Sequence, residues 1–174
     1  MFPTAHLALA LIPVVAFALV RDRRIPSTSL VGLCAVGSQF PDLIDKPLAH
    51  VFHLIPSGRV FMHSLPFAIP LSLLVGWYAL ETHRLRAGAV FVFAYGTHVL
   101  ADNWTGLTDG NPELPPDLLW PFVQPVQRPV VPHWAGIGSI NLHLWAVFSA
   151  VVLSVFGYVV IRDLQEHETV FRRG

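Results

Sequence analysis

Long apolar stretches alternate along the chain with short segments that carry charges, prolines and histidines. A helix needs roughly 20 apolar residues, with about 17 to 25 the usual range, to cross the hydrocarbon core of a bilayer. The apolar stretches that approach this length are residues 5–20, 25–40, 62–80, 87–100 and 142–161. The pattern therefore predicts an all-α integral membrane protein, with residues 1–174 as one domain built as a bundle of about five transmembrane helices.

Positively charged residues orient these spans, because Lys and Arg in short flanking segments stay on the cytoplasmic side. With five crossings, eight of the eleven basic residues fall on one side of the membrane, namely Arg21, Arg23, Arg24, Arg84, Arg86, Arg162, Arg172 and Arg173. Four crossings, with the second stretch re-entrant, would divide them between both sides. We therefore expect a multi-pass protein of the inner or plasma membrane, with its N-terminus outside and its C-terminus in the cytoplasm.

Two long connections then lie on the outer side, at about residues 41–61 and 101–141. The second holds seven prolines and three tryptophans: Pro112, Pro115, Pro116, Pro121, Pro125, Pro129 and Pro132, with Trp104, Trp120 and Trp134. Proline removes a backbone donor and interrupts regular structure, and tryptophan is enriched at membrane–water boundaries. We expect this connection to be an irregular lid that rests on the outer interface.

The composition supports a surface that faces lipid. Hydrophobic residues make up 53% of the 174 and charged residues 13%, whereas a soluble domain carries about 25% charged residues. The net charge is zero and no basic stripe is present, so the expected partner is the lipid bilayer and no nucleic acid is expected. The lone Cys34 excludes an intrachain disulfide and a thiolate metal cage. The nine histidines are unusual, because ionisable residues are rare in membrane spans.

Several of these histidines share one predicted layer with acidic residues. Hydropathy and the arginines alone place the following residues at the outer ends of the spans: His6, Asp42, Asp45, Arg59, His63, His98 and Asp102. His98 and Asp102 are spaced i and i+4, which puts both on one face of a helix with Cβ atoms about 5–6 Å apart. A carboxylate near hydrocarbon is costly unless it is paired or bound to a metal. The layer therefore predicts a metal site or a tightly coupled polar site.

The donor types indicate which ion and which chemistry this site would support. The candidate ligands are His6, Asp42, Asp45, His63, His98 and Asp102. Imidazole and carboxylate without thiolate favour Zn²⁺, with Mn²⁺ or Fe²⁺ as alternatives. Such an ion activates water, a spare carboxylate such as Asp45 would accept the proton, and Arg59 would bind an anionic group. Either Asp42 or Asp45 can be the ligand, because both could share a helix face.

The remaining histidines have weaker claims to this site. His83 and His167 lie beside arginines on the predicted inner side, where interfacial anchoring is the simpler interpretation. His50 and His53 fall in the first outer connection and are interpreted as loop residues. His133 and His143 lie on the outer side, but no spacing links them to the other candidates.

In order and spacing, these residues resemble a family of small inner-membrane, metal-dependent hydrolases related to a LexA-binding membrane protein. The resemblance covers roughly residues 1 to 105 and rests on His6, the acidic pair Asp42 and Asp45, Arg59 before His63-Ser64, and His98 with Asp102. The acidic pair is wider than the family's usual doublet, and Ser57-Gly58-Arg59 replaces a common His-Arg-Gly. The motif order is also similar to the zinc phospholipase C and single-strand nuclease superfamily, although Val147 stands where a second His-x-x-x-Asp/Glu motif would end.

These observations favour a membrane-embedded metal-dependent hydrolase that acts at the outer membrane face on a phosphoester or lipid-linked substrate. The alternative is a membrane transporter, or a metal-binding or partner-binding membrane subunit, without catalysis. Transporters place polar sites near the bilayer midplane, whereas the candidate residues here fall at span ends. This depth favours the hydrolase.

Overall fold

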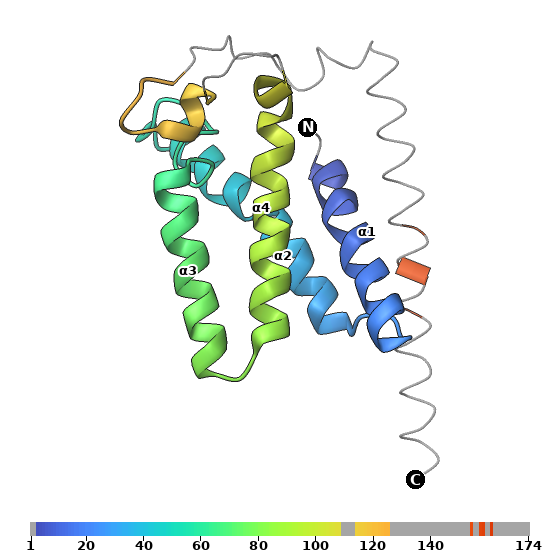
Figure 1. Cartoon of the computed structure of the whole chain (residues 1–174). Coiled ribbons are helices and arrows are strands. Elements are labelled where there is room, and N and C mark those ends of the chain that lie inside the picture. Colours follow the sequence, from blue (N-terminus) through green and yellow to red (C-terminus); the bar gives the residue numbers. More distant parts are fainter. Residues whose placement is uncertain (1–2, 109–113, 126–153, 155–156, 159–160, 162–174) are drawn as a thin grey trace.

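The computed structural model describes residues 3–108 and 114–125, together with 154, 157–158 and 161 (Figure 1). These residues form helices and connecting segments and contain no strand. The elements are α1 (Pro3–Asp22), α2 (Thr28–His50), α3 (Leu65–Glu81), α4 (Leu85–Thr108) and the short 3₁₀ helix η1 (Pro116–Leu119). The expected all-helical fold is therefore confirmed for the described part of the chain.

Two tight turns pair the helices into hairpins. Arg23 lies in the turn between α1 and α2 with a φ of 52°, and His83 lies in the turn between α3 and α4 with a φ of 56°. Both turns lie at the lower end of the bundle in Figure 1. The side chain of Arg86, at the start of α4, donates two hydrogen bonds to Asp22 at the end of α1, at 3.0 and 2.9 Å. The two hairpins are thus joined at this end by one ion pair.

Small residues let α2 and α4 approach closely. A Cβ built on Gly37 of α2 would lie 2.8 Å from the carbonyl oxygen of Phe91 in α4. Around this contact a core cluster of Ala10, Leu11, Cys34 and Ala94 joins α1, α2 and α4. Close backbone approach through small residues is how helices gain packing energy in lipid, where no hydrophobic force acts between them.

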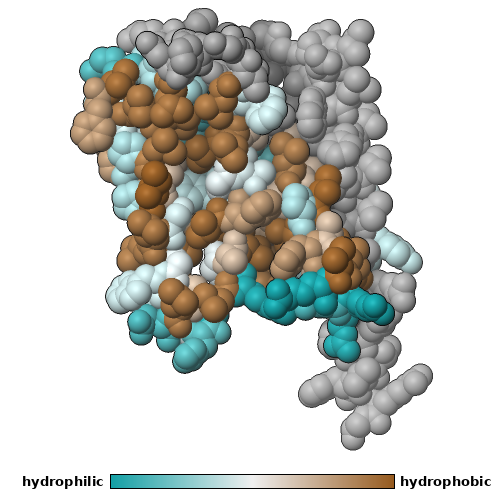
Figure 2. All heavy atoms as spheres, viewed as in Figure 1, coloured by the Kyte–Doolittle hydropathy of each residue, from teal (hydrophilic) through white to brown (hydrophobic). Residues whose placement is uncertain are grey.

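The outer surface of the bundle is apolar over much of its length. On α3, Leu73 is 69% exposed and Trp77 is 60% exposed. Figure 2 shows a broad hydrophobic surface above a hydrophilic lower edge. By length and composition, Thr4–Asp22 is the helix among the described residues that can cross a bilayer, and Leu65–Glu81 is a shorter apolar helix. The fifth predicted span, 142–161, lies outside the described residues apart from Ser154, Gly157, Tyr158 and Ile161, all of which are helical.

Two helices continue past their predicted ends. The second span was expected to end at residue 40, but α2 runs through Pro41 and Pro47 to His50. The fourth was expected to end at residue 100, but α4 continues to Thr108. The predicted outer connections at 41–61 and 101–141 therefore begin as helix. The physical reason is that the polar residues of these extensions face one another in the interior of the bundle, so hydropathy drops there while the helices continue.

Part of the predicted lid packs against the bundle. Leu118 of η1 is buried in a cluster with Ala68 of α3 and with Tyr95 and Val99 of α4. The ring of Trp120 lies 5.7 Å from that of Phe67, centroid to centroid. Residues 114–125 thus cover the end of the α3–α4 hairpin opposite its turn (Figure 1).

Candidate metal centre

Three helices and the segment before α3 bring the predicted polar residues together at the end of the bundle opposite the hairpin turns. α1 contributes His6, α2 contributes Asp42 and Asp45, and α4 contributes His98 and Asp102, while His63 lies just before α3. His63, His98 and Asp45 have an exposed fraction of 0%, and His6 of 1%. The site is therefore buried inside the bundle. Asp42, Asp45 and Asp102 lie on the parts of α2 and α4 that extend beyond the predicted spans, whereas His98 lies within one.

Hydrogen bonds fix the tautomers of two histidines. Nδ1 of His63 donates to Oδ2 of Asp45 at 2.8 Å, and Nδ1 of His98 donates to the backbone carbonyl of Ser38. In a neutral ring the other nitrogen, Nε2, then carries a lone pair instead of a proton. The two Nε2 atoms face one another at 3.1 Å. Metal-binding histidines usually donate one ring N–H to an acceptor and bind the metal through the other nitrogen. Both rings have this orientation, with Nδ1 as the donor and Nε2 left for a metal.

Two carboxylate oxygens complete a four-residue cage. Oδ1 of Asp42 lies 3.6 Å from His63 Nε2 and 3.8 Å from His98 Nε2. Oδ2 of Asp102 lies 3.7 and 3.9 Å from the same two nitrogens. All four ligand atoms lie within 4.8 Å of one another. Ligand atoms bound at about 2.0–2.1 Å to a tetrahedral ion are roughly 3.3 Å apart, so the cage matches the size of a metal ion.

The electrostatics of the cage also fit a cation. Oδ1 of Asp42 is buried and has no hydrogen-bond partner among the described residues. It faces two nitrogen lone pairs and a second carboxylate, so four electron-rich atoms meet with no hydrogen between them. A buried polar group left in this way is costly. The buried cluster of Asp42, His63, His98 and Asp102 can therefore hold a metal ion.

Asp45 lies outside the cage, behind His63. Its Oδ2 accepts from His63 Nδ1, and its Oδ1 accepts from the backbone N–H of Met62 at 2.8 Å. The hydroxyl of Tyr95 donates to the carbonyl of Met62 at 2.6 Å and holds the same loop from α4. Of the two aspartates that the sequence leaves open, Asp42 points its oxygen at the cage and Asp45 orients a histidine.

Two cations flank the carboxylates of the cage. Nζ of Lys46 lies 2.6 Å from Asp42 Oδ2, and Nε of Arg59 lies 3.2 Å from Asp102 Oδ2. The Lys46 side chain is 34% exposed and that of Arg59 is 39% exposed, so both reach from the cage towards solvent. The second oxygen of Asp102, Oδ1, lies 3.1 Å from His6 Nε2, so both oxygens of this carboxylate have a basic neighbour.

His6 packs against the cage without joining its four ligands. Its ring stacks on His98, with centroids 3.9 Å apart and an interplanar angle of 22°. Its Nε2 lies 3.1 Å from Asp102 Oδ1, but neither ring nitrogen meets hydrogen-bond geometry with the described residues. His6 therefore packs on His98 and lies beside Oδ1 of Asp102, whereas Oδ2 is the oxygen near the two ligand nitrogens.

The other histidines lie apart from this cluster. His50, at the end of α2, has its Nε2 3.0 Å from the position that a Cβ on Gly58 would take. His53 is exposed, and His83 lies in the turn at the opposite end of the bundle. His133, His143 and His167 lie outside the described residues.

Three contributors to the site were not identified from the sequence: the Ser38 carbonyl, Lys46 and Tyr95. Lys46 follows Asp42 at i+4, a spacing that pairs opposite charges on a helix and was available as a signal. Tyr95 precedes His98 by one turn, which shows only that they share a helix face. A backbone carbonyl such as that of Ser38 leaves no side-chain pattern, so nothing in the sequence marks it.

Over the residues that the structure describes, the chain forms a helical bundle with a largely apolar surface and a buried two-histidine, two-aspartate cluster that can hold a metal ion. The family model described as YdjM inner membrane protein matches residues 1–170. The chain therefore belongs to the YdjM inner membrane protein family, which confirms the expected inner-membrane location. No curated protein and no solved structure gives a significant match. The resemblance to hydrolases and to zinc phospholipase C stays a prediction.

Proposed function

We propose that this protein is a membrane-embedded, metal-dependent hydrolase whose site lies at the outer membrane face. The observation that carries the proposal is the convergence of two histidine nitrogens and two aspartate oxygens in one buried cage. The proposal includes five spans, with the N-terminus outside and the C-terminus in the cytoplasm, because the arginine-rich turns lie at the end of the bundle opposite the cage.

The number of ligands constrains how catalysis can occur. Structural zinc sites are closed by four ligands, whereas catalytic sites keep a position open for water or substrate. Four protein ligands therefore leave room for catalysis only at an ion with five or six ligands, or after one carboxylate has moved away. Asp102 is the better candidate to move, because Arg59 and His6 already contact its two oxygens.

The residues of the chain have separate roles in this proposal. Asp42, His63, His98 and Asp102 would hold the ion, and Asp45 would orient His63 rather than accept a proton, because both of its oxygens are engaged. The chemistry that such an ion supplies is activation of water, whose pKa falls to about 7 on Zn²⁺. The oxygen of Asp102 beside His6 is the place in the cluster where a proton from water can be accepted.

The flanking cations favour an anionic substrate. Arg59 and Lys46 are the partly exposed groups beside the cage, and each contacts one cage carboxylate. Guanidinium binds phosphate through a fixed fork of donors. Arg59 would therefore give up its contact with Asp102 and bind a phosphoryl oxygen of the substrate instead. A site at the headgroup level of the membrane would be accessible to a phosphoester or a lipid-linked substrate.

The first experiment measures bound metal. Elemental mass spectrometry of the detergent-purified protein should find near-stoichiometric Zn, Mn or Fe, which His98→Ala and Asp102→Ala should both lose. His83→Ala is the matched control, because it removes a histidine from the opposite end of the bundle and should keep the metal. Absence of metal after addition of each ion to chelator-free preparations would overturn the proposal.

A second candidate function is metal binding or transport without catalysis, which the four-ligand cage favours because it can close around a tetrahedral ion. Arg59→Gln separates the two functions, because Arg59 contacts a ligand but is not one of the four. A hydrolase would keep its metal and lose turnover of phosphoester substrates in this variant. If the metal-loaded wild-type protein hydrolyses no phosphodiester or lipid phosphate in a broad screen, the binding function would replace the hydrolase.

A further inference from the structure

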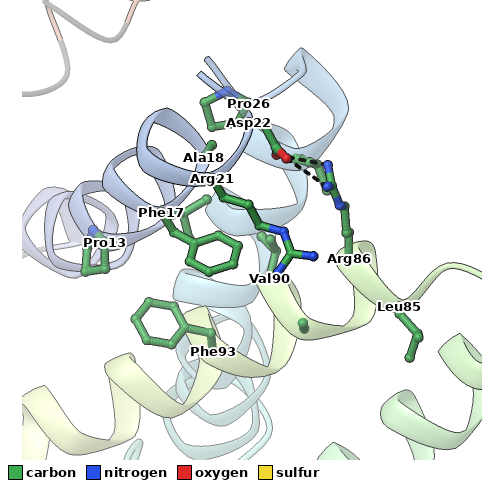
Figure 3. A pocket seen from close by; sticks show the side chains of 13 residues that line it. Pro13, Phe17, Ala18, Arg21, Asp22, Pro26, Leu85, Arg86, Val90 and Phe93 are labelled. Atoms are coloured by element: carbon green, nitrogen blue, oxygen red, sulfur yellow. Dashed lines mark hydrogen bonds and ion pairs between the residues drawn. The ribbon is translucent and has the colours of Figure 1, made fainter. Parts of the chain in front are cut away.

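A cavity of about 500 Å³ lies at the other end of the bundle, between α1, the start of α2 and the start of α4 (Figure 3). Its walls are mostly apolar, with Pro13 and Phe17 from α1 and Val90 and Phe93 from α4. Small-molecule pockets usually measure about 300–1,000 Å³, so the cavity can accept a substantial apolar group. None of its lining residues belongs to the metal cage.

One edge of the cavity is charged. Figure 3 shows Arg21 and Arg86 on one side of the cavity, with the rings of Phe17 and Phe93 on the side away from Arg86. Arg86 is occupied by its two hydrogen bonds to Asp22. The guanidinium of Arg21 instead lies over the Phe17 ring, 5.8 Å from its centroid, and forms no ion pair within the part of the chain that the structure describes. The cavity therefore combines an apolar interior with one cation whose charge is not balanced.

We propose that this cavity binds an anionic phospholipid of the cytoplasmic leaflet. One acyl chain would lie between Phe17 and Phe93, and the phosphate would contact Arg21. Basic pockets between helices on the cytoplasmic side are typical sites for anionic headgroups, and the arginine-rich turns assign this end of the bundle to that side.

The lipid at this site is distinct from the substrate of the proposed hydrolase. Arg21 follows His6 by 15 positions on the continuous helix α1, which corresponds to roughly 22 Å along the helix axis. The lipid site therefore requires no metal chemistry and can be tested without it.

The test is native mass spectrometry of the full-length protein with dioleoylphosphatidylglycerol or dioleoylphosphatidylcholine. The wild type should bind the anionic lipid more tightly. Arg21→Gln should weaken that binding about fivefold, since one basic contact at a membrane surface is worth about that factor. Arg21→Lys, which retains the charge, should recover part of the affinity. Arg24→Gln is the matched control, because it removes the same charge three residues away, outside the cavity lining.

A second variant tests the apolar part of the site. Ala89 lines the cavity and is exposed, so Ala89→Trp should fill the space without disturbing the buried core, and should weaken binding of both lipids. If Arg24→Gln matched Arg21→Gln, binding would reflect diffuse surface charge and the site would be wrong. Unchanged lipid binding in a folded Ala89→Trp protein would equally overturn it.

Discussion

At one end of the bundle the histidines and aspartates of the cage are buried and contact one another, whereas at the opposite end charged side chains surround an apolar cavity and are more exposed. Asp45, His63 and His98 have no exposed surface. At the other end, the Arg86 side chain is 65% exposed and that of its partner Asp22 is 32% exposed. The same kinds of groups thus occupy two very different environments within one small bundle.

The difference in burial determines how strongly stability and metal binding depend on the charged groups at each end. A buried ionisable group is tolerated only with partners, and loss of one partner leaves the other unpaired in a medium of low dielectric constant. An exposed pair is solvated in either state and contributes little. We therefore expect substitutions in the cage to have large effects on metal binding, and charge substitutions at the turns to have small effects on stability.

The largest effect should come from removal of a cage ligand. His63→Ala deletes one of the two nitrogens that face each other at 3.1 Å. Loss of a partner outside the ligand set commonly weakens metal binding about 10–100-fold, and loss of a ligand should exceed about 100-fold. Competition with a fluorescent chelator measures this change. His50→Ala, which removes a histidine outside the cage, should bind metal as the wild type does. If His63→Ala also bound metal as tightly as the wild type, His63 would not be a ligand.

Substitution behind the cage should have the next largest effect. Asp45→Asn keeps the size of the side chain but replaces the carboxylate that accepts from His63 Nδ1. Metal affinity should fall about 10–100-fold, because the ring loses the acceptor that fixes its tautomer. Asp22→Asn provides the comparison at the opposite end and should leave metal affinity unchanged. Similar losses in both variants would mean that overall charge, and not orientation of His63, determines binding.

Much of the cage could be predicted from the sequence, because hydropathy places span ends and the polar residues fall at those ends. His98 and Asp102 lie on one helix at the predicted spacing, and both carry cage atoms. The sequence could not show which of Asp42 and Asp45 is the ligand. Residues three apart lie on nearly the same helix face, and only the packing of the helix decides which of the two side chains points at the site. His63 was also a predicted ligand and carries a cage atom, but the Asp45 and Tyr95 contacts that hold its loop could not be predicted.

The helix ends could not be predicted either. Hydropathy drops after residue 40, and Pro41 and Pro47 lack a backbone N–H, a combination that is typical of a helix end. In the structure α2 continues through both prolines, and its polar face is buried against α4. The cavity at the other end was also missed, because Phe17 and Phe93 look like ordinary lipid-facing residues in the sequence.

A third prediction concerns the crossing of α2 and α4, which connects the two ends. In Gly37→Val the new Cβ would lie 2.8 Å from the Phe91 carbonyl oxygen and 3.1 Å from Ala94 Cβ, so the helices must separate. Overpacking of this kind costs about 1–3 kcal/mol. Sodium dodecyl sulfate titration in mixed micelles measures the loss. Gly32→Val is the control on the same helix, because a Cβ there has no neighbour within 4 Å.

The Gly37 variant also sharpens the comparison between the two ends. Movement of α4 away from α2 would separate His98 from Asp42, so metal affinity should fall together with stability. Gly32→Val should change neither quantity by much. A Gly37→Val protein with normal stability and normal metal binding would mean that α2 and α4 do not cross at this glycine.

The smallest effect should come from the ion pair between the hairpins. Arg86→Gln removes both hydrogen bonds to Asp22, and an exposed pair contributes about 0–1 kcal/mol to stability. Arg84→Gln, an exposed arginine of the neighbouring turn, controls for the change in net charge. A double-mutant cycle with Asp22→Asn isolates the pair, and its coupling energy should shrink as salt is added. A coupling above about 2 kcal/mol would exceed the range for an exposed pair. The turn end would then depend on its charges as the cage end does, and the contrast between the two ends would fail.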